Sequence, residues 1–394
     1  MTLHMKQSAR MNPFFKLFVM DWTLILLLAV LSAVGIAILY SAGRADCANQ
    51  FKCLIKYGSW TPWAASQLPK MVAGFLLLVL VAIIDLKYWV KYAYWIYGVS
   101  IFALVLVMFV GHAGMGAQRW LSLGFIRFQP SEMMKVGLVL ALAKYFAGLS
   151  INEIRSDYYL IFPCMLAFFP TLLVVAQPDL GTAMSLLVVS AIVFFIAGVQ
   201  WWKFGIVILV AALSFPFIWK YGLYDYQRAR VVIFLNPEQD VMGSGYHITQ
   251  SKITIGSGGL TGKGYLEGTQ SHLNFLPEKQ TDFIFTMLAE EFGLFGCLAL
   301  FVLVMGILWR CYRIAFTSRN NFGRLLSLGI ATNFFVYFFI NTMMVMGLLP
   351  VVGVPSPLLS YGGTSVLTIL FGFGLAECCY VHNDMLVSTK SSYI

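Results

Sequence analysis

The segment WTLILLLAVLSAVGIAILY, residues 22–40, decides the fold class of this chain. It carries no charged side chain, and it matches the length of about 20 apolar residues that a helix needs to cross a bilayer. It also exceeds the apolar core of a secretory signal peptide, which is roughly 7–15 residues long, so we expect a retained first helix. Lys6, Arg10 and Lys16 precede it and predict a cytoplasmic N-terminus.

Similar apolar runs recur along all 394 residues, of which 60% are hydrophobic and 11% charged. A soluble domain has roughly 25% charged residues, so this composition excludes a soluble fold and predicts an all-α polytopic membrane protein. The net charge of +9 is spread between the apolar runs, so we expect no nucleic-acid partner. The seven cysteines form no CxxC pair and the five histidines are scattered, which argues against a structural zinc or haem site.

The apolar runs predict ten transmembrane helices in one membrane domain spanning residues 1–394, with both termini in the cytoplasm. Lys and Arg are more frequent in the segments assigned to the cytoplasm than in the short outer loops, as the positive-inside rule requires. A long outer loop, 221–283, separates helices seven and eight, and we expect it to form an ordered lid on the membrane surface. The predicted helices are 20–42, 69–86, 92–111, 129–148, 158–176, 181–199, 204–220, 284–309, 325–347 and 364–382.

Polar residues at membrane depth are costly and usually functional, and the first group enters the fourth helix in GAQRWLSLGFIRFQPSEMMK, 116–135. Glu132 alone could simply complement the helix dipole. Lys135 lies one turn deeper on the same face, so we expect the two to form an ion pair facing a wet cavity. Trp120 follows Arg119, and it could either anchor the chain at the membrane interface or stack on a sugar.

Two further groups begin the sixth and eighth helices. In QPDLGT, 177–182, Asp179 could start the helix or could line the mouth of the same outer cavity with Gln177. In LNFLPEKQTDFIFTMLAEE, 273–291, Asp282 precedes an apolar run. Asp282 could cap the eighth helix, or it could act as a base whose pKa is raised by desolvation.

Glu290 and Glu291 lie deeper in the eighth helix and need partners. They could serve packing or gating, or they could contact the substrate. The segment GLLPVVGVPSPLLSYGGTS, 347–365, contains too many prolines and glycines for a straight span. We expect it to fold back as a re-entrant loop that packs inside the protein or lines a cavity. All these polar groups fall on the predicted outer side, which suggests one site.

At these segments the chain resembles the SEDS family (shape, elongation, division and sporulation), and the resemblance covers nearly its whole length. LLPVVGVP and GYHITQSKITIGSGG are more similar to the RodA branch than to the FtsW branch. The motifs that carry the resemblance are GAQRWLSLGFIRFQPSE, AQPDLGT, YQRARVVIFLNP, GYHITQSKITIGSGGLTGKG, GTQS, FLPEKQTDFIF, LAEEFG and SYGGTS.

The resemblance implies the ten-helix SEDS fold in the bacterial inner membrane. It implies a peptidoglycan glycosyltransferase that polymerises lipid II into glycan strands during elongation and releases undecaprenyl diphosphate. The implied partners are a class B penicillin-binding protein, a transpeptidase of the penicillin-binding protein 2 type, and other elongation-complex proteins. The family's essential acid corresponds to Asp282 and its functional tryptophan to Trp120.

The chain departs from the family pattern in three places. Gln280 stands where the family commonly has His, so we expect Asp282 to be the base. Ser356 replaces an apolar residue. The first outer loop, 43–68, is longer than usual and contains Cys47 and Cys53. We expect these two cysteines to form a disulfide, because the outer compartment is oxidising, although two free thiols remain the alternative.

Glycosyl transfer needs a base for the attacking sugar hydroxyl and positive charge for the departing diphosphate. We assign the base to Asp282, and the charge to basic side chains or to a hydrated Mg²⁺ or Mn²⁺, for which the sequence identifies no ligand set. The absence of a second carboxylate nearby favours a one-step inverting displacement. The residues we assign to substrate binding are Trp120, Arg119, Glu132, Lys135, Gln177, Asp179, Arg228, Arg230, Gln280 and Ser360.

Two other classes of function stay open. A flippase or transporter of a lipid-linked cell-wall precursor would also use many spans, buried charges and a broken segment. It would need polar groups along a path from inside to outside, whereas the groups above gather outside. A scaffolding role would require Asp282 to be dispensable.

Overall fold

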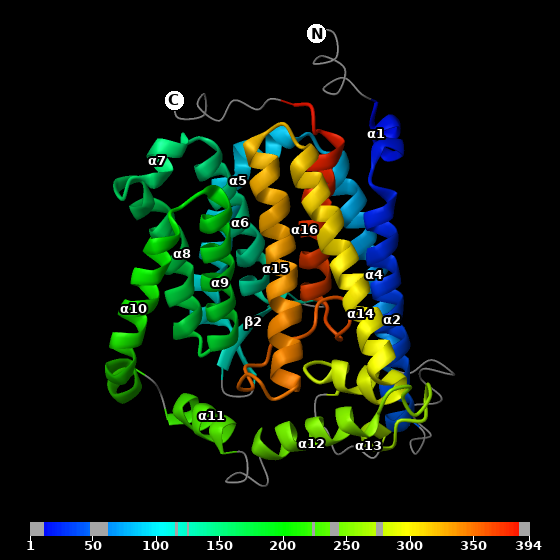
Figure 1. Ribbon diagram of the computed structural model, residues 1–394. Coiled ribbons are helices and arrows are strands. Elements are labelled where there is room, and N and C mark those ends of the chain that lie inside the picture. Colours follow the sequence, from blue (N-terminus) through cyan, green and yellow to red (C-terminus); the bar gives the residue numbers. More distant parts are fainter. Residues whose placement is uncertain are drawn as a thin grey trace.

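The computed structural model describes residues 12–47, 62–114, 117–123, 126–222, 225–236, 244–272 and 279–385. Within these ranges each predicted span overlaps one long helix, and the helices stand side by side as a bundle (Figure 1). They are α2 Trp22–Cys47, α4 Pro62–Ile83, α5 Leu86–Val110, α6 Pro130–Ala147, α8 Tyr158–Ala176, α9 Leu180–Ala197, α10 Trp201–Phe217, α14 Ile284–Thr317, α15 Asn321–Val345 and α16 Thr364–Val381.

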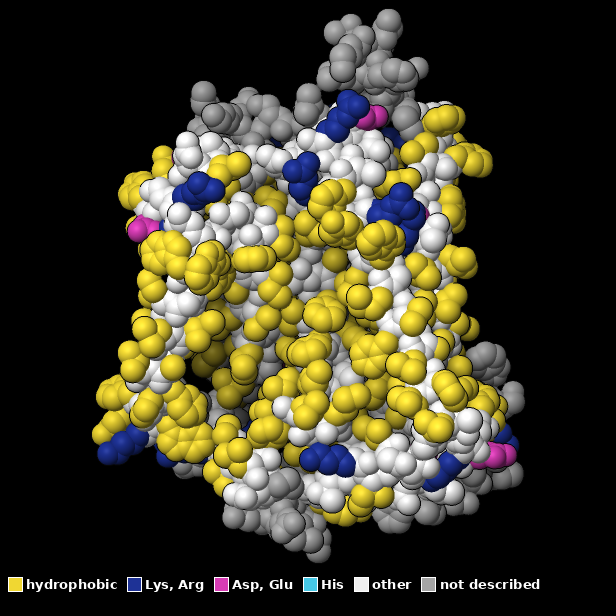
Figure 2. All heavy atoms as spheres, viewed as in Figure 1, with side chains coloured by type: hydrophobic (Ala, Val, Ile, Leu, Met, Phe, Trp, Pro, Cys, Tyr) yellow, Lys and Arg dark blue, Asp and Glu magenta, His cyan; other side chains and the backbone are white. Residues whose placement is uncertain are grey.

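Eight of these helices are long and apolar enough to cross a membrane, counted over the described residues. The remaining two are α6, which carries Glu132, Lys135 and Lys144, and α10, which is only 17 residues long. The chain is therefore a multi-pass membrane protein, while the number of ten crossings stays a prediction. Figure 2 shows apolar side chains covering the middle of the bundle and most Lys and Arg near its two ends, as membrane embedding requires.

The two ends of the bundle differ. One end, which we call the terminal face, carries the short helices α1 Pro13–Val19 and α7 Ile151–Arg155 together with the C-terminal end of α16 (Figure 1). The other end, the loop face, carries helices α11 Asp225–Leu235, α12 Ser244–Ser257 and α13 Thr269–His272. These three helices follow the π-helical turn η3 Ile218–Gly222, and the role of the long loop as a lid stays a prediction.

A small antiparallel sheet, which we did not predict, also lies at the loop face. Its order is β1 His112–Gly114, β2 Ala117–Leu123 and β3 Ile126–Phe128. Two of the strands are only three residues long, and the seven-residue β2, AQRWLSL, does not alternate strictly between apolar and polar residues, so the sequence shows no strand pattern. The sheet brings β2, with Arg119 and Trp120, over the end of the bundle.

The segment 346–363, between α15 and α16, folds back into the bundle as predicted. Val354, Ser356, Leu358 and Leu359 are 2% exposed or less. A side chain at Gly35 of α2 would overlap the backbone of Leu358, so helix and segment are in direct contact. The segment is irregular backbone enclosed by protein, which is the condition under which such backbone is tolerated at membrane depth.

Helix α14 is broken near the loop face, where Gly293 has φ +62°. The turn 258–264, which we call the strap, supplies the hydrogen bonds that the break leaves unmade. The amides of Leu294 and Phe295 donate to the carbonyls of Gly259 and Leu260, at 3.0 and 3.1 Å. In return, the amides of strap residues 263 and 264 donate to carbonyls of α14. The break in α14 is thus locked in place by the long loop.

The strap and its neighbours also provide the partners that Glu290 and Glu291 require. The Glu290 carboxylate lies 2.7 Å from the Lys263 ammonium, and Ser41 donates a hydrogen bond to Glu291. These contacts favour the packing interpretation of the two acids. The predicted disulfide cannot be followed, because Cys53 and the side chain of Cys47 lie outside the described residues. The other five cysteines are free thiols, as expected.

Candidate active site

Asp282 lies where the long loop ends and α14 begins, on the loop face. The residue at the N-cap position of α14 is Phe283, one place later, so the capping interpretation of Asp282 is not supported. Asn341 of α15 fixes the backbone here, because its side-chain amide donates to the carbonyls of Asp282 and Val354, both at 2.8 Å. Asp282 is partly exposed.

The Asp282 carboxylate faces the re-entrant segment at Gly353. A side-chain carbon built on Gly353 would lie 3.6 Å from Asp282 Oδ2, and the φ of +71° at this position favours glycine. The re-entrant segment thus passes directly beside the carboxylate at Gly353.

Residues 280–282 and 360–361 run side by side and are joined by hydrogen bonds. The Tyr361 amide donates to the Gln280 carbonyl at 2.8 Å, and the Ser360 hydroxyl donates to the Thr281 carbonyl at 2.5 Å. Ser360 also accepts from the Ser356 amide at 2.8 Å and is only 3% exposed. Ser360, predicted as a substrate contact, instead positions the backbone before Asp282. This contact uses only the backbone amide of Ser356, so it does not explain the polar side chain at position 356.

The predicted ion pair between Glu132 and Lys135 is present, with Nζ and Oε2 2.7 Å apart. The expected wet cavity is not what these side chains face, because they are only 4% and 3% exposed. The Lys135 ammonium lies 3.4 Å from the centre of the Tyr337 ring, and the Tyr337 hydroxyl is 3.1 Å from Ser185 Oγ. The pair is therefore a buried link between α6, α15 and α9.

Asp179 fulfils the helix-starting role considered for it, while its other role, lining the mouth of an outer cavity, stays a prediction because the residue is only 5% exposed. It is the N-cap of α9, where its carboxylate accepts hydrogen bonds from the amide and hydroxyl of Thr182, at 3.3 and 2.9 Å. It also lies 4.0 Å from the Arg119 guanidinium on β2. Arg119 donates to the carbonyls of Gln177 and Pro178, and the Gln177 side chain donates to Leu104 of α5. Gln177 is thus a structural link, and Arg119 ties the sheet to α9.

The start of α9 also reaches the surroundings of Asp282 through the re-entrant segment. A side-chain carbon on Gly181 would lie 2.7 Å from the Val352 carbonyl and 3.0 Å from the Val354 side chain. The glycine thus allows α9 to pack directly against residues 352–354, which border Asp282. The structure brings together the Asp179 cluster, the re-entrant segment and Asp282, as the sequence suggested.

Two predicted arginines are not part of this group. Arg228 and Arg230 lie on α11, which crosses the loop face away from the start of α14 (Figure 1). The Arg228 guanidinium donates to the carbonyl of Lys220 at 3.0 Å. Trp120 is 37% exposed on β2, which is compatible with either role considered for it.

Comparisons with known proteins identify the family. The family model described as "Cell cycle protein", which covers FtsW, RodA and SpoVE, matches residues 21–384. The chain is 41% identical over 343 residues to the peptidoglycan glycosyltransferase MrdB of Escherichia coli K12, covering 84% of this chain and 92% of the relative. It is 35% identical over 365 residues to a probable peptidoglycan glycosyltransferase FtsW of Trichlorobacter lovleyi, covering 92% and 93%. The chain belongs to the SEDS family.

Solved structures agree with this placement of the SEDS chain. A chain of a peptidoglycan synthase complex that coordinates polymerization and crosslinking superposes with a TM-score of 0.77 at 31% identity, covering 92% of this chain and 98% of that one. RodA of Thermus thermophilus superposes with a TM-score of 0.66 at 27% identity, covering 92% and 97%. The predicted SEDS fold and the resemblance to RodA are confirmed.

The sequence interpretation of this SEDS protein missed four residues that build the site: Lys70, Tyr337, Asn341 and Tyr361. Asn341 could have been predicted from the sequence, because a side-chain amide within the apolar stretch VYFFINTMMV of α15 needs hydrogen-bond partners. Lys70 drew no attention because it stood at the very start of the helix predicted at 69–86, where a basic residue is ordinary. The observed α4 starts at Pro62 and keeps Pro69 in its interior, so Lys70 belongs to the helix.

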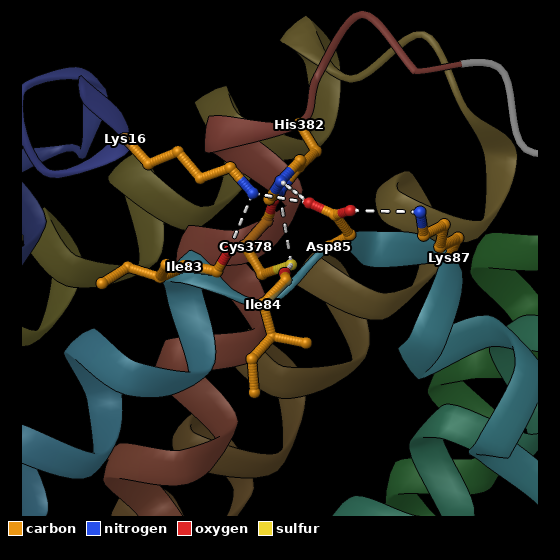
Figure 3. Close-up of polar contacts among 7 residues, drawn as sticks. All are labelled: Lys16, Ile83, Ile84, Asp85, Lys87, Cys378 and His382. Carbon is orange, nitrogen blue, oxygen red and sulfur yellow. Dashed lines mark hydrogen bonds and ion pairs between the residues drawn. The ribbon is translucent and has the colours of Figure 1, made fainter. Parts of the chain in front are cut away.

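A separate polar cluster at the terminal face joins α1, the α4–α5 turn and α16 (Figure 3). Asp85 lies 2.5 Å from Lys16, 3.3 Å from Lys87 and 3.3 Å from His382 Nε2. His382 Nδ1 lies 2.9 Å from the Cys378 carbonyl. Burial opposes ionisation of Asp85, but the bonds from Lys16 and Lys87 lower its pKa below the usual value. Burial lowers the pKa of His382. These contacts hold helix ends together.

The described residues offer little to hold a metal on their own. They contain no group of three or more His, Cys, Asp or Glu side chains arranged to bind an ion. Among these residues, a divalent cation would fit the mode in which one or two carboxylates and substrate phosphates share it.

Proposed function

We propose that this protein is a peptidoglycan glycosyltransferase that polymerises lipid II into glycan strands during cell elongation. The observation that carries the proposal is the position of the Asp282 carboxylate, at the junction of the long loop, α14 and the re-entrant segment. Its relatives are named as peptidoglycan glycosyltransferases, and the chain matches them over most of their length, which supports the same activity.

In the proposed reaction Asp282 is the general base. Its carboxylate takes the proton of the acceptor sugar hydroxyl, the hydroxyl oxygen bonds to the anomeric carbon of the donor, and the bond from that carbon to the diphosphate breaks. A positioned base of this kind contributes roughly 10²- to 10⁴-fold to the rate. One displacement inverts the anomeric centre, and undecaprenyl diphosphate leaves.

The surrounding residues hold this base in place. Asn341 fixes the Asp282 carbonyl and Ser360 fixes that of Thr281, so the carboxylate is presented from a backbone that is bonded on both sides. The Glu132–Lys135 pair and the Asp179–Arg119 contact stabilise α6, α9 and β2 around the same region. Trp120 contributes an exposed ring on which a sugar can stack.

A Mg²⁺ or Mn²⁺ ion would be held by the diphosphate oxygens of the substrate, because Asp282 is assigned to the acceptor hydroxyl on the opposite side of the anomeric carbon. It would supply positive charge to the leaving group.

The loop face would be the outer side of the bacterial inner membrane and the terminal face the cytoplasmic side, with both termini inside. A class B penicillin-binding protein of the penicillin-binding protein 2 type, acting with other elongation proteins, would crosslink the strands. The similarity to a chain of a peptidoglycan synthase complex supports a partner of this kind.

The test is to supply purified protein, with and without its partner, with lipid II in detergent and to separate the products on a gel. Long glycan strands would support the polymerase. Transfer of lipid II across a vesicle membrane without polymer would favour the flippase alternative instead. The activity should survive inactivation of the partner's crosslinking site, because the two reactions use different proteins.

A further inference from the structure

We propose that Lys70 binds the diphosphate of the lipid-linked substrate, next to the base. The inference rests on the proposed function, because it assigns a binding residue to that same site. Lys70 lies eight residues after the start of α4 at the loop face, which places it roughly 12 Å along the helix at 1.5 Å per residue. A charged side chain at this depth is costly and indicates a functional site.

The contacts of Lys70 show what holds it. Its ammonium lies 4.0 Å from the centre of the Tyr361 ring, and its alkyl chain passes close to Gly363. Burial opposes ionisation of the Tyr361 phenol, but the hydrogen bonds from Lys70 and Ser66 lower its pKa. The ring thus orients the ammonium without neutralising it.

Three other cations near the loop face are paired with carboxylates. Arg119 lies beside Asp179, Lys135 is paired with Glu132, and Lys263 is paired with Glu290. In the described part of the chain, by contrast, no carboxylate contacts the Lys70 ammonium. A partly buried cation with no acid beside it is suited to receive an anion that arrives with a ligand.

The position of Lys70 selects the diphosphate as that anion. Tyr361, which Lys70 contacts, donates its amide to Gln280, and Ser360 bonds to Thr281, so the ammonium and Asp282 flank one hydrogen-bonded pair of segments. In glycosyl transfer the base acts on the acceptor hydroxyl, and the charge that develops on the departing diphosphate needs a cation nearby. Lys70 is placed to supply it.

The experiment measures binding of undecaprenyl diphosphate, and of undecaprenol as the uncharged comparison, to the full-length protein in nanodiscs. The variants are Lys70→Gln, which removes the charge, and Lys70→Arg, which keeps it. Lys252→Gln, an exposed lysine of α12 on the same face, is the matched control. Melting temperatures identify variants that fold, and lipid II polymerisation is measured in parallel.

We expect wild type to bind the diphosphate lipid more tightly than undecaprenol. Lys70→Gln should weaken diphosphate binding roughly ten- to a hundredfold, as for loss of a charged hydrogen bond, and leave undecaprenol binding unchanged. Lys70→Arg should retain most of the affinity, and Lys252→Gln should match wild type.

A folded Lys70→Gln protein that binds the diphosphate lipid as wild type does would overturn the assignment, even if its polymerisation were impaired. If that variant does not fold, a wild type without preference for the diphosphate lipid over undecaprenol would overturn it equally. A protein that shows the expected binding pattern but makes no glycan would instead contradict the proposed function and leave Lys70 as an anion-binding residue.

Discussion

At the scale of single residues, the buried pair of Glu132 and Lys135 shows how polar groups here serve the architecture of the site. The two charges lie 2.7 Å apart and are closed off from solvent, with Tyr337 covering the ammonium. Neither charge would be stable there alone, because no opposite charge would offset the free-energy cost of removing it from water. Their value lies in fixing α6 against α15 and α9 near the site.

A double-mutant cycle tests this pair. Lys135→Ala should lower the free energy of unfolding by roughly 3–5 kcal/mol, because it leaves Glu132 buried without its partner. Lys135→Ala combined with Glu132→Ala should cost less than Lys135→Ala alone. Thermal unfolding in detergent measures all four proteins, and simple additivity of the two single changes would rule out the coupling.

The role of a single residue could be predicted only where its own side chain was unusual for its place in the sequence. Glu132, Lys135, Asp179 and Asp282 were identified because charged residues stand out in apolar sequence. The roles of Gln177 and Ser360 could not be separated from substrate binding, because their partners are backbone carbonyls distant in the chain.

At the scale of elements, the strap at 258–264 holds the break in α14. Gly262 has φ +81°, and a side-chain carbon there would overlap the carbonyl of Glu291. Gly262→Ala should therefore lower stability by at least about 1–3 kcal/mol, the cost of a strained backbone. Melting temperature measures the effect.

Gly256→Ala is the matched control for this change. Gly256 lies in α12, and nothing lies within 4 Å of the position its side chain would take. Replacing a helical glycine by alanine should stabilise by roughly 0.5–1 kcal/mol. If Gly262→Ala melted no lower than Gly256→Ala, the strap would not hold α14.

The cluster around Asp85 predicts a pH dependence at the other end of the bundle. Because burial lowers the pKa of His382 in the folded state, the folded protein binds fewer protons than the unfolded chain in mild acid. Stability should be fully present above the ordinary pKa of 6.5 and should be lost as the pH falls below it. The lowered pKa of Asp85 acts in the same direction at still lower pH.

The melting temperature measured from pH 8 to 5.5 should therefore fall, and it should fall less in His382→Gln. The charged groups that face His382 are Lys16 and Asp85, with Lys87 and the Cys378 thiol close by (Figure 3). A wild-type protein that became more stable on acidification would show that attraction to Asp85 outweighs burial.

Elements were predictable from sequence where the physical signal was long and periodic. Each apolar run predicted one long helix, and the prolines and glycines of 347–365 predicted the re-entrant fold. The start of α4 was placed seven residues too late, at 69 in place of the observed 62, because residues 62–68 are less apolar than the rest. The sheet at 112–128 was missed because its strands depend on one another for their hydrogen bonds.

At the scale of the whole molecule, the account depends on which face is outside. Helix α1 and the C-terminal end of α16 lie at the terminal face, opposite the sheet, the helices of the long loop and the start of α14 (Figure 1). Alkaline phosphatase, which is active only outside the cytoplasm, should be inactive when fused after Ile394 and active when fused to a chain that ends at Asn236. The reverse pattern would place Asp282 in the cytoplasm and remove it from any extracytoplasmic reaction.

The packing of the whole bundle also brings together parts of the site that are far apart in the sequence. The α9 start, the α14 start and α4 meet at the re-entrant segment, through Gly181, Asp282 and Lys70. No single stretch of sequence predicts these contacts, because they arise from packing between helices that are far apart in the chain. For this reason the sequence predicted one outer site, but we assigned Arg228 and Arg230 to substrate binding and not Lys70.

The measurement that tests the central claim most directly is lipid II polymerisation by Asp282→Asn. Asparagine keeps the size of the side chain and a hydrogen-bond acceptor but cannot take the proton from the acceptor hydroxyl. The account predicts that polymerisation falls by roughly 10²- to 10⁴-fold, while the melting temperature and lipid II binding stay close to wild type. A folded Asp282→Asn protein that makes long glycan strands at the wild-type rate would contradict it.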